Sequence, residues 1–484
     1  MMQLNYQLLT DLYQLTMAQG YWHSGKDADE ACFHMFFRTN PFEGGYSIAC
    51  GMAQLAEMVE TFGFDEADIE YLRGLQAPAG GPMFDDDFLQ HLANFQLAVD
   101  IDAVYEGTVV FPNEPLVRVK GPIVHCQLLE TALLNCINFQ TLVATKAARV
   151  CLAAQSPVAE FGLRRAQGFA GGVWASRAAV VGGCASTSNV LAGQIFDIPV
   201  SGTHAHSWVM AFDSELEAFR AYAKAFPHNC VLLIDTYDTM QGLENAITVG
   251  LEMAERGEKL LGIRIDSGDL AWLAKECRKR LDAAGLTETG IVLSNDLDEY
   301  TIRSIRDQGA QVASWGVGTK LATAYDQPSL GGVYKLSAMR TEGGPWVDRI
   351  KITGQLIKMT VPGVLNIRRY YHDDGTIAGD MVYDVNQPVN DEGRIIDPMD
   401  DLRQKVLGDK RYDTLLAPLA RNGKVVLEKE YSSTMQARQR AIEGLQQLDE
   451  SQKRMLNPHS YPVGLEAGLY KRRHELIARL RGVK

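Results

Sequence analysis

The repeat that decides the fold is clearest at residues 231–238, VLLIDTYD, and again at 261–269, LGIRIDSGD. Each stretch is a short apolar run that ends in an acidic loop, and an amphipathic stretch such as 271–284 follows. The pattern returns at 291–293, and this alternation of strand and helix is typical of a parallel sheet. Because the units repeat over residues 155–340 and no G-x-G-x-x-G fingerprint follows the first strand, the sequence favours an irregular (β/α) barrel over a doubly wound sheet.

The chain on either side of this repeat has a different rhythm, and we expect three parts. Residues 1–150 form an α+β domain, residues 151–342 form the α/β barrel, and residues 343–484 pack back on the first part. The first and third parts together would be a discontinuous α+β domain built from the N- and C-terminal segments. Further helices are predicted at 12–22, 127–152, 298–308, 433–445 and 469–480, and further strands at 31–37, 46–50, 98–105, 116–119, Val200, 312–314, 364–371 and 379–385.

Composition and charge exclude several classes of function. With 484 residues, of which 46% are hydrophobic and 22% charged, the chain is typical of a globular protein with more than one domain. No run of about 18 apolar residues predicts a membrane span, and the first residues lack the pattern of a secretory signal, so we expect the cytoplasm. The net charge of -13 argues against nucleic acid as a partner, because binding a phosphate backbone needs an extended basic face.

The eight cysteines predict neither a zinc site nor a disulfide framework. None of them has the C-x-x-C spacing that is typical of zinc sites. We expect them to be reduced and mostly buried, and to pack as small apolar side chains.

Two acidic loops follow consecutive strands of the repeat, one from Asp235 to Asp238 and one from Asp266 to Asp269. Alternation along the strand puts Arg264 and Asp266 on the same face. One such loop alone is more simply a turn and a helix cap. Two loops at neighbouring strand ends, with an arginine beside one of them, favour binding of ribose hydroxyls or of a metal-bound diphosphate.

Other polar groups at the ends of strands predict an anionic, phosphate-rich ligand. Gly318 and Thr319 belong to a G-x-G-T loop late in the repeat, where backbone N–H groups and a hydroxyl can approach a phosphate. Such a loop alone is usually only a tight connection. The cations that could hold an anion locally are Arg164, Arg165, Arg177, Arg264 and Lys320.

The two histidines in the segment 202–207, GTHAHS, allow three interpretations. A histidine in an apolar strand is usually a satisfied core residue. His204 and His206 could also bind a metal together, because residues i and i+2 of a strand share a face, but no third His or Cys lies at a useful spacing. A histidine beside a phosphate site can instead attack a phosphoryl group and carry it covalently.

Nearly the whole sequence resembles the nicotinate phosphoribosyltransferases. The resemblance rests on motifs that are specific only in combination: 9–14 (LTDLYQ), 37–41 (FRTNP), 161–168 (FGLRRAQG), 187–193 (TSNVLAG), 201–208 (SGTHAHSW), 265–269 (IDSGD), 316–319 (GVGT), 328–335 (PSLGGVYK) and 457–463 (NPHSYPV). It implies a barrel of the type II phosphoribosyltransferase kind. It also implies that nicotinate and phosphoribosyl diphosphate give nicotinate mononucleotide and diphosphate, the first step of NAD synthesis from nicotinate, with Mg²⁺ and with coupled hydrolysis of ATP.

Carried over position by position, the resemblance implies roles for the histidine and for the groups around the pyridine ring. His206 matches the histidine that ATP transiently phosphorylates. Tyr13 and Phe161 would sandwich the flat ring of nicotinate. Arg264, with Thr203 nearby, would face the nicotinate carboxylate or the adjacent phosphate. Because Tyr13 would come from a neighbouring subunit, the resemblance implies a homodimer with shared active sites.

The same resemblance assigns the rest of the substrate. Arg164 would be a second cation at the ring. Asp266, with Asp235, would hold ribose hydroxyls and serve the reaction, and Gly318 and Thr319 would hold the 5-phosphate. No residue is assigned to the Mg²⁺ ion.

Some features bear on the alternatives. Ser188 stands where the related nicotinamide enzyme carries an acidic residue, and its absence removes repulsion toward a carboxylate, which favours nicotinate. The triplet Cys184-Ala185-Ser186 departs from many relatives, with no consequence that we can assign.

A quinolinate-type phosphoribosyltransferase should need more cations and usually a shorter chain. A non-catalytic protein that binds phosphoribosyl compounds is the third reading, against which both acidic loops and His206 argue.

Overall fold

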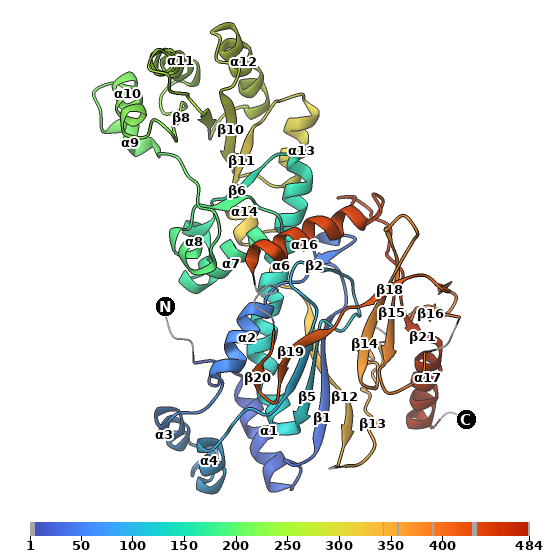
Figure 1. Ribbon diagram of the computed structural model, residues 1–484. Helices are drawn as coiled ribbons and strands as arrows, with labels where there is room; N and C mark the ends of the chain where they lie inside the picture. Colours follow the sequence, from blue (N-terminus) through green and yellow to red (C-terminus); the bar gives the residue numbers. More distant parts are fainter. Residues whose placement is uncertain (1–4, 342, 356–357, 390–391, 428–432, 483–484) are drawn as a thin grey trace. The chain divides into compact units, whose positions relative to one another are not determined.

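The computed structural model describes residues 5–341, 343–355, 358–389, 392–427 and 433–482. The chain divides into two compact units (Figure 1): unit 1 comprises Met1–Leu142 and Ser329–Lys484, and unit 2 comprises Val143–Pro328. These bounds differ from the expected 150 and 342. The first bound lies inside one long helix, α6 (Glu130–Ala154), and just beyond the second, strand β12 (Gly332–Arg340) pairs with β1 of unit 1 instead of extending the repeat.

Unit 2 is built on a six-stranded sheet in which every neighbouring pair is parallel. The order is β7 (Ser186–Thr187), β6 (Val158–Glu160), β11 (Ser314–Val317), β10 (Gly290–Asn295), β9 (Gly262–Ile265) and β8 (Val231–Leu233). The predicted strands at 231–234, 261–263 and 291–293 are confirmed, whereas the one predicted at 312–314 begins only at Ser314. Val200 makes a single parallel bridge, to Thr187. The α/β class is therefore confirmed, while among the described residues no ladder closes the sheet into a ring.

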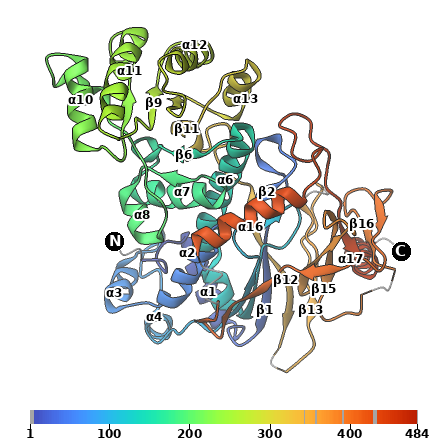
Figure 2. The same ribbon diagram turned by 45° about the horizontal axis from the view of Figure 1, so that its top comes forward.

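Acidic N-caps start the helices that follow β8, β9 and β10 of unit 2. Asp238, Asp269 and Asp298 each accept a backbone N–H three residues on, at 2.8, 3.0 and 2.7 Å. They begin α11 (Thr239–Glu255), α12 (Leu270–Ala283) and α13 (Glu299–Asp307), which Figures 1 and 2 show beside the strands. The last acid of each acidic loop is thus a helix cap, and the first acid is left for another role. The other helices of unit 2 are η2 (Leu163–Arg165), α7 (Phe169–Val181), α8 (Val190–Phe196), α9 (His206–Met210), α10 (Glu215–Ala225) and α14 (Thr319–Ala322).

Unit 1 joins segments from the two ends of the chain in one antiparallel sheet. Strand β1 (Glu30–Phe37) lies between β5 (Val117–Pro122) and β12, and β3 (Asp100–Ala103) pairs with β19 (Ala417–Arg421). Figure 2 shows β1 and β12 side by side although some 300 residues of sequence separate them, as the pairing of Glu30 with Arg340 illustrates. The first and last segments of the chain therefore share one fold.

The remaining elements of unit 1 complete this sheet and add two others. The seven-stranded sheet has the order β13-β12-β1-β5-β3-β19-β20, a six-stranded sheet has the order β17-β16-β21-β15-β14-β18, and β2 pairs with β4. The bounds of these strands are β2 Ser47–Ile48, β4 Val109–Val110, β13 Val347–Asp348, β14 Leu365–Tyr371, β15 Ile377–Asp384, β16 Arg394–Ile396, β17 Gln404–Val406, β18 Tyr412–Thr414, β20 Lys424–Val425 and β21 Val463–Glu466. The helices are α1 Leu12–His23, α2 Met52–Thr61, α3 Glu66–Gly74, α4 Asp86–Ala93, α5 Ile123–Leu128, α16 Thr434–Gln447 and α17 Ala467–Arg481.

The cysteines behave as small core residues. All eight are reduced, and every one except the half-buried Cys151 is buried, as predicted. Burial raises the pKa of Cys32, Cys136 and Cys277 to about 12, so these thiols stay protonated at neutral pH. Within the described residues, no helix combines the length and the apolar character that crossing a membrane requires.

Candidate active site

The polar residues that the sequence singled out in unit 2 gather at the carboxyl ends of its parallel strands. Phe161 follows β6, Asp235 lies just beyond β8, and Asp266 follows β9. Ser294 lies near the end of β10 and Gly318 follows β11. Because carboxyl ends of parallel strands meet at one edge of a sheet, residues far apart in the sequence come within hydrogen-bond distance here.

Arg264 is the centre of this group. Its guanidinium donates to the Thr203 hydroxyl at 3.0 Å, to the Ser294 hydroxyl at 2.8 Å and to the Asp266 carboxylate at 3.0 Å. Ser294 in turn donates to the same Asp266 oxygen. The guanidinium carbon lies 5.6 Å from the centre of the Phe161 ring, within the range of a cation–π contact. A fixed cation and an aromatic ring are therefore presented side by side.

The first acid of the other acidic loop is only half satisfied. Asp235 Oδ2 accepts the backbone N–H of Asp266 at 2.9 Å and the Ser267 hydroxyl at 2.6 Å. Its Oδ1 is buried and has no hydrogen-bond partner among the described residues. A buried acceptor without a donor is costly, so this oxygen is suited to a hydroxyl or a cation that a ligand would bring.

The structure separates the two histidines, which do not lie on one strand. His204 is buried in a coil segment, and its Nε2 accepts the backbone N–H of Leu233 at 3.1 Å. Burial lowers the pKa of His204 to about 4, so the ring is neutral. His206 is instead the first residue of α9, half-buried, with its Nδ1 3.1 Å from the Thr236 hydroxyl. His204 is thus the satisfied core residue, and His206 is the histidine that can meet a ligand.

Close backbone approaches fix the loops around Phe161. The Phe161 N–H donates to the carbonyl of Val317 at 2.8 Å. A Cβ atom on Gly316 would lie 2.6 Å from the Phe161 ring, and one on Gly318 would lie 3.1 Å from the Phe161 carbonyl oxygen. Any larger residue at position 316 would displace the ring. Thr319, the first residue of α14, is half-buried.

The remaining predicted cations differ in accessibility. Arg164 and Arg165 are exposed on η2. Arg177 is buried in α7, with its guanidinium carbon 5.6 Å from the centre of the Phe196 ring, so it does not offer an exposed charge. Lys320 donates to Asp298 at 2.7 Å, and this bond holds the pKa of Lys320 above its usual value.

Neither Tyr13 nor Ser188 is among the hydrogen-bond partners described for Arg264. Tyr13 belongs to unit 1, where its side chain is exposed on α1. Ser188 is half-buried after β7 and donates its backbone N–H to the Glu160 carbonyl at 2.9 Å.

Sequence reasoning missed four groups that the structure places in or beside the cluster. Thr236 and Ser267 each follow a predicted acidic residue, Ser294 lies near the end of β10, and Glu160 directly precedes Phe161. A hydroxyl next to a strand-end acid is a usable signal, because the strand end is where ligand-facing residues collect. Nothing in the sequence shows that the Glu160 side chain turns inward.

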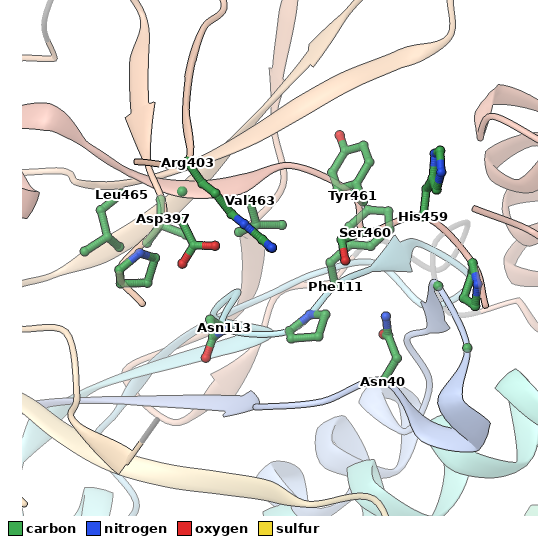
Figure 3. A pocket seen from close by; sticks show the side chains of 17 residues that line it. Asn40, Phe111, Asn113, Asp397, Arg403, His459, Ser460, Tyr461, Val463 and Leu465 are labelled. Carbon is green, nitrogen blue, oxygen red and sulfur yellow. The ribbon is translucent and has the colours of Figure 1, made fainter. Parts of the chain in front are cut away.

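A separate cavity of about 210 Å³ lies in unit 1 (Figure 3). Phe111 and Tyr461 stack in its wall with ring centres 3.8 Å apart, and the Tyr461 hydroxyl donates to buried Asp380 at 2.8 Å. None of the residues expected to serve the reaction lines this cavity. The motif at 457–463 thus has a packing role that holds this wall together.

The described part of the chain contains no group of three or more His, Cys, Asp or Glu side chains that could hold a metal ion. Asp235 and Asp266 still offer carboxylates at neighbouring strand ends, where the backbone N–H of Asp266 donates to the Asp235 carboxylate. Mg²⁺ usually binds one or two carboxylates together with substrate phosphates and water, so a protein cage is not required. The donor set fits an ion that arrives with a diphosphate.

Comparisons with known proteins agree along the whole chain. Sequence models match the nicotinate phosphoribosyltransferase N-terminal domain at residues 8–138, the nicotinate phosphoribosyltransferase family at 157–349 and the C-terminal domain at 366–473. Nicotinate phosphoribosyltransferase from Bacillus subtilis (strain 168) is 42% identical over 482 residues, which are 98% of this chain and 96% of the relative. The Homo sapiens relative is 37% identical over 444 residues, 80% of this chain and 81% of its own.

Solved structures show the same likeness in three dimensions. The crystal structure of human nicotinic acid phosphoribosyltransferase has a TM-score of 0.82 at 33% identity, and the match covers 96% of this chain and 99% of that one. Nicotinate-nucleotide pyrophosphorylase from Pyrococcus furiosus has a TM-score of 0.69 at 20% identity, covering 92% and 99%, which shows a shared fold alone.

Proposed function

The chain belongs to the nicotinate phosphoribosyltransferase family, and on this premise we propose that the strand ends of unit 2 are the site of an ATP-dependent reaction. Nicotinate and phosphoribosyl diphosphate would give nicotinate mononucleotide and diphosphate there. The observation that carries the proposal is the position of Arg264, held by Thr203, Ser294 and Asp266 with its guanidinium 5.6 Å from the Phe161 ring. A flat ring that bears a carboxylate needs such a pair, one group to stack on and one to bind the charge.

The other contacts to the pyridine ring follow the family resemblance. Phe161 and Tyr13 of the partner subunit would sandwich the ring, which requires a homodimer with shared active sites. Exposed Arg164 would be a second cation. Thr203 supports Arg264 and would lie close to the same carboxylate or phosphate.

The phosphoribosyl group would occupy the acidic side of the cluster. Asp266 and Asp235 would accept ribose hydroxyls, and the half-satisfied Asp235 supports this because its Oδ1 has no donor in the described part of the chain. Gly318 and Thr319 would hold the 5-phosphate at the end of β11. The same two carboxylates would hold Mg²⁺ bound to the diphosphate. The ion supplies positive charge to the leaving diphosphate.

Departure of diphosphate leaves a ribose with oxocarbenium character, so the protein has to place the pyridine nitrogen rather than remove a proton from it. Phe161 would bind the face of the ring, and Arg264, through the carboxylate, would aim the nitrogen at the anomeric carbon. The Asp266 and Asp235 carboxylates would hold the sugar and place negative charge near the developing cation. The new carbon–nitrogen bond forms as the carbon–oxygen bond to diphosphate breaks.

His206 would couple ATP to this reaction. A ring nitrogen would attack the γ-phosphorus of ATP, the bond to ADP would break, and water would later release phosphate. The half-buried position of His206 and the Thr236 hydroxyl 3.1 Å from its Nδ1 support this role, because one ring nitrogen is held while the ring stays accessible. Phosphorylation would add negative charge beside the site and could change substrate affinity.

We also propose that unit 2 is a barrel closed by one short segment in place of a hydrogen-bonded ladder. Val200 bridges Thr187 at one edge of the sheet. Four residues later, the His204 ring accepts the N–H of Leu233 on β8, the other edge strand. The segment between Val200 and His204 therefore contacts both edges, which supports an irregular barrel.

The proposed reaction is tested by supplying phosphoribosyl diphosphate with nicotinate, nicotinamide or quinolinate, with and without MgATP, and measuring mononucleotide and diphosphate. Of the three bases, we expect only nicotinate to give product, because Arg264 can bind its single carboxylate. Product from quinolinate with no product from nicotinate would refute the substrate assignment. Binding of phosphoribosyl diphosphate without turnover of any base would refute the catalytic assignment.

A further inference from the structure

The Glu160 carboxylate is wholly buried directly behind Phe161. It accepts three hydrogen bonds, from the Gly162 N–H, from the Ser176 hydroxyl at 2.9 Å and from the Thr187 hydroxyl at 2.6 Å. These donors come from the loop after β6, from α7 and from β7. One side chain therefore ties together three elements that meet at the strand ends.

These bonds fix the backbone on both sides of Phe161. The Gly162 N–H, just after Phe161, is held by Glu160, and the Phe161 N–H, just before its side chain, is held by the Val317 carbonyl at 2.8 Å. The ring itself rests against Gly316, where a Cβ atom would come within 2.6 Å. The position and orientation of the Phe161 ring are therefore fixed by β6, by β11 and by the buried Glu160 carboxylate.

Holding a loop in place with a buried carboxylate costs free energy of folding. Taking an ionised group out of water is expensive unless every lone pair finds a donor, and an apolar residue would fill the same space without that cost. A carboxylate can, however, bind a backbone N–H and two hydroxyls at once, which an apolar side chain cannot. The cost is justified where the exact placement of the neighbouring residue matters.

We propose that Glu160 is the positioning residue for the pyridine substrate, acting through Phe161. The inference rests on the proposed function, in which Phe161 stacks on nicotinate. It adds that the affinity for the base, and not for phosphoribosyl diphosphate, depends on the Glu160 carboxylate. The contacts of the sugar and phosphates, at Asp235, Asp266 and Gly318, involve none of its three hydrogen bonds.

The test is steady-state kinetics of Glu160→Gln, with each substrate varied in turn and wild type beside it. The amide has one acceptor oxygen, so it cannot satisfy both the Gly162 N–H and the two hydroxyls. We expect the KM for nicotinate to rise about tenfold, while the KM for phosphoribosyl diphosphate and kcat stay within about twofold. Exposed Glu255→Gln, in the same unit, is the matched control and should leave all three constants unchanged.

A second variant keeps the test decisive if Glu160→Gln does not fold. Ser176→Ala removes one of the three donors from a helix, where alanine is well tolerated, and should raise only the KM for nicotinate, by about two- to threefold. Equal changes in both KM values, or a fall in kcat with the nicotinate KM unchanged, would overturn the positioning role alone. A wild-type protein that forms no mononucleotide would overturn the proposed function and this inference with it.

Discussion

Two residues of the same type do different work in each acidic loop of unit 2. The Asp266 carboxylate accepts a hydrogen bond from Arg264, and the Asp235 carboxylate accepts one from the backbone N–H of Asp266. Asp238 and Asp269 instead cap helices. The sequence allowed both the cap and the ligand-binding interpretation of such a loop. The structure confirms the cap interpretation for the last acid of each loop, while ligand binding by the first acid, at the strand end, stays a prediction.

His204 and His206 also have different roles, and the role of His206 gives a kinetic prediction. Replacing His206 by alanine should remove the stimulation of mononucleotide formation by MgATP and leave the reaction without ATP in place, since its described hydrogen bond is to Thr236 alone. Initial rates with and without MgATP measure this. His228→Ala, an exposed histidine, is the control. Full ATP stimulation in His206→Ala would remove the phosphoryl role.

His204 should instead govern stability, and the direction with pH follows from its lowered pKa. The unfolded chain takes up a proton near pH 6.5 and the folded protein only near pH 4. The stabilising contribution of neutral His204 is therefore complete above pH 6.5 and is lost as the pH falls toward 4. His34, with a pKa of about 3, and His125, with one of about 4, act in the same direction.

Two replacements at this position separate hydrogen bonding from titration. His204→Gln keeps an acceptor for the Leu233 N–H and removes the ring that titrates, so its melting temperature should depend less on pH between 6.5 and 4 than that of wild type. His204→Ala leaves the Leu233 N–H without its acceptor and should cost about 1–3 kcal/mol at pH 7. Melting curves across this pH range measure both, and identical slopes for wild type and His204→Gln would contradict the assignment.

At the scale of elements, the sequence predicts the parts that repeat and misses those that do not. The strands β8, β9 and β10 of unit 2 are short apolar runs ended by polar loops, and they were predicted within two residues, whereas β6 and β7 were not predicted. The helix expected at 127–152 is in fact two, α5 and α6, which meet at Leu129, and the strand expected at 46–50 is reduced to Ser47–Ile48. Strands such as β16 and β18 are only three residues long, so they carry no periodicity that a sequence could show.

Because Asp269 caps a helix, we predict that replacing it changes the stability of the protein and not the binding of substrate. Asp269→Ala should destabilise the protein by about 1 kcal/mol, because the Trp272 N–H loses its acceptor, and should leave the KM for phosphoribosyl diphosphate unchanged. Denaturation and steady-state kinetics on the same preparation measure the two effects. A large rise in that KM would place Asp269 in the substrate site rather than in the cap.

At the scale of the whole molecule, the sequence indicated α/β architecture with the two chain ends in one fold, and both are present in the structure. It could not fix the bounds, because α6 runs through the first one and β12 is distinguished from the repeat only by its pairing with β1. Nor could it separate the motifs that serve packing from those that serve the reaction. The motif at 457–463 stacks Tyr461 on Phe111 above a buried group of Asp380, Glu114 and Arg369.

Glu114, in that buried group, should make the stability of unit 1 depend on pH. Burial, and then the neighbouring Asp380 carboxylate, raise the pKa of Glu114 well above its usual value. The folded protein thus keeps a proton that the unfolded chain releases above about pH 4.5, so this group costs stability as the pH rises. Glu114→Gln mimics the protonated form and removes that cost. The melting temperature of Glu114→Gln relative to wild type should therefore rise from pH 5 to pH 8.

Exposed Glu60→Gln is the control for this measurement, since it makes the same substitution without changing the buried group. A melting temperature of Glu114→Gln that stays at a constant offset from wild type across the range would show that Glu114 titrates normally.

The central claim is that phosphoribosyl transfer takes place around Arg264 and Asp266 at the strand ends of unit 2. Its most direct test is the rate of nicotinate mononucleotide formation by wild type and by Asp266→Asn in the same assay, with melting curves to confirm that both are folded. The account predicts turnover by wild type and a loss of at least about a hundredfold in the variant, because Asp266 holds Arg264 and, as proposed, would also accept the ribose hydroxyls. A folded Asp266→Asn that forms product at the wild-type rate would contradict it.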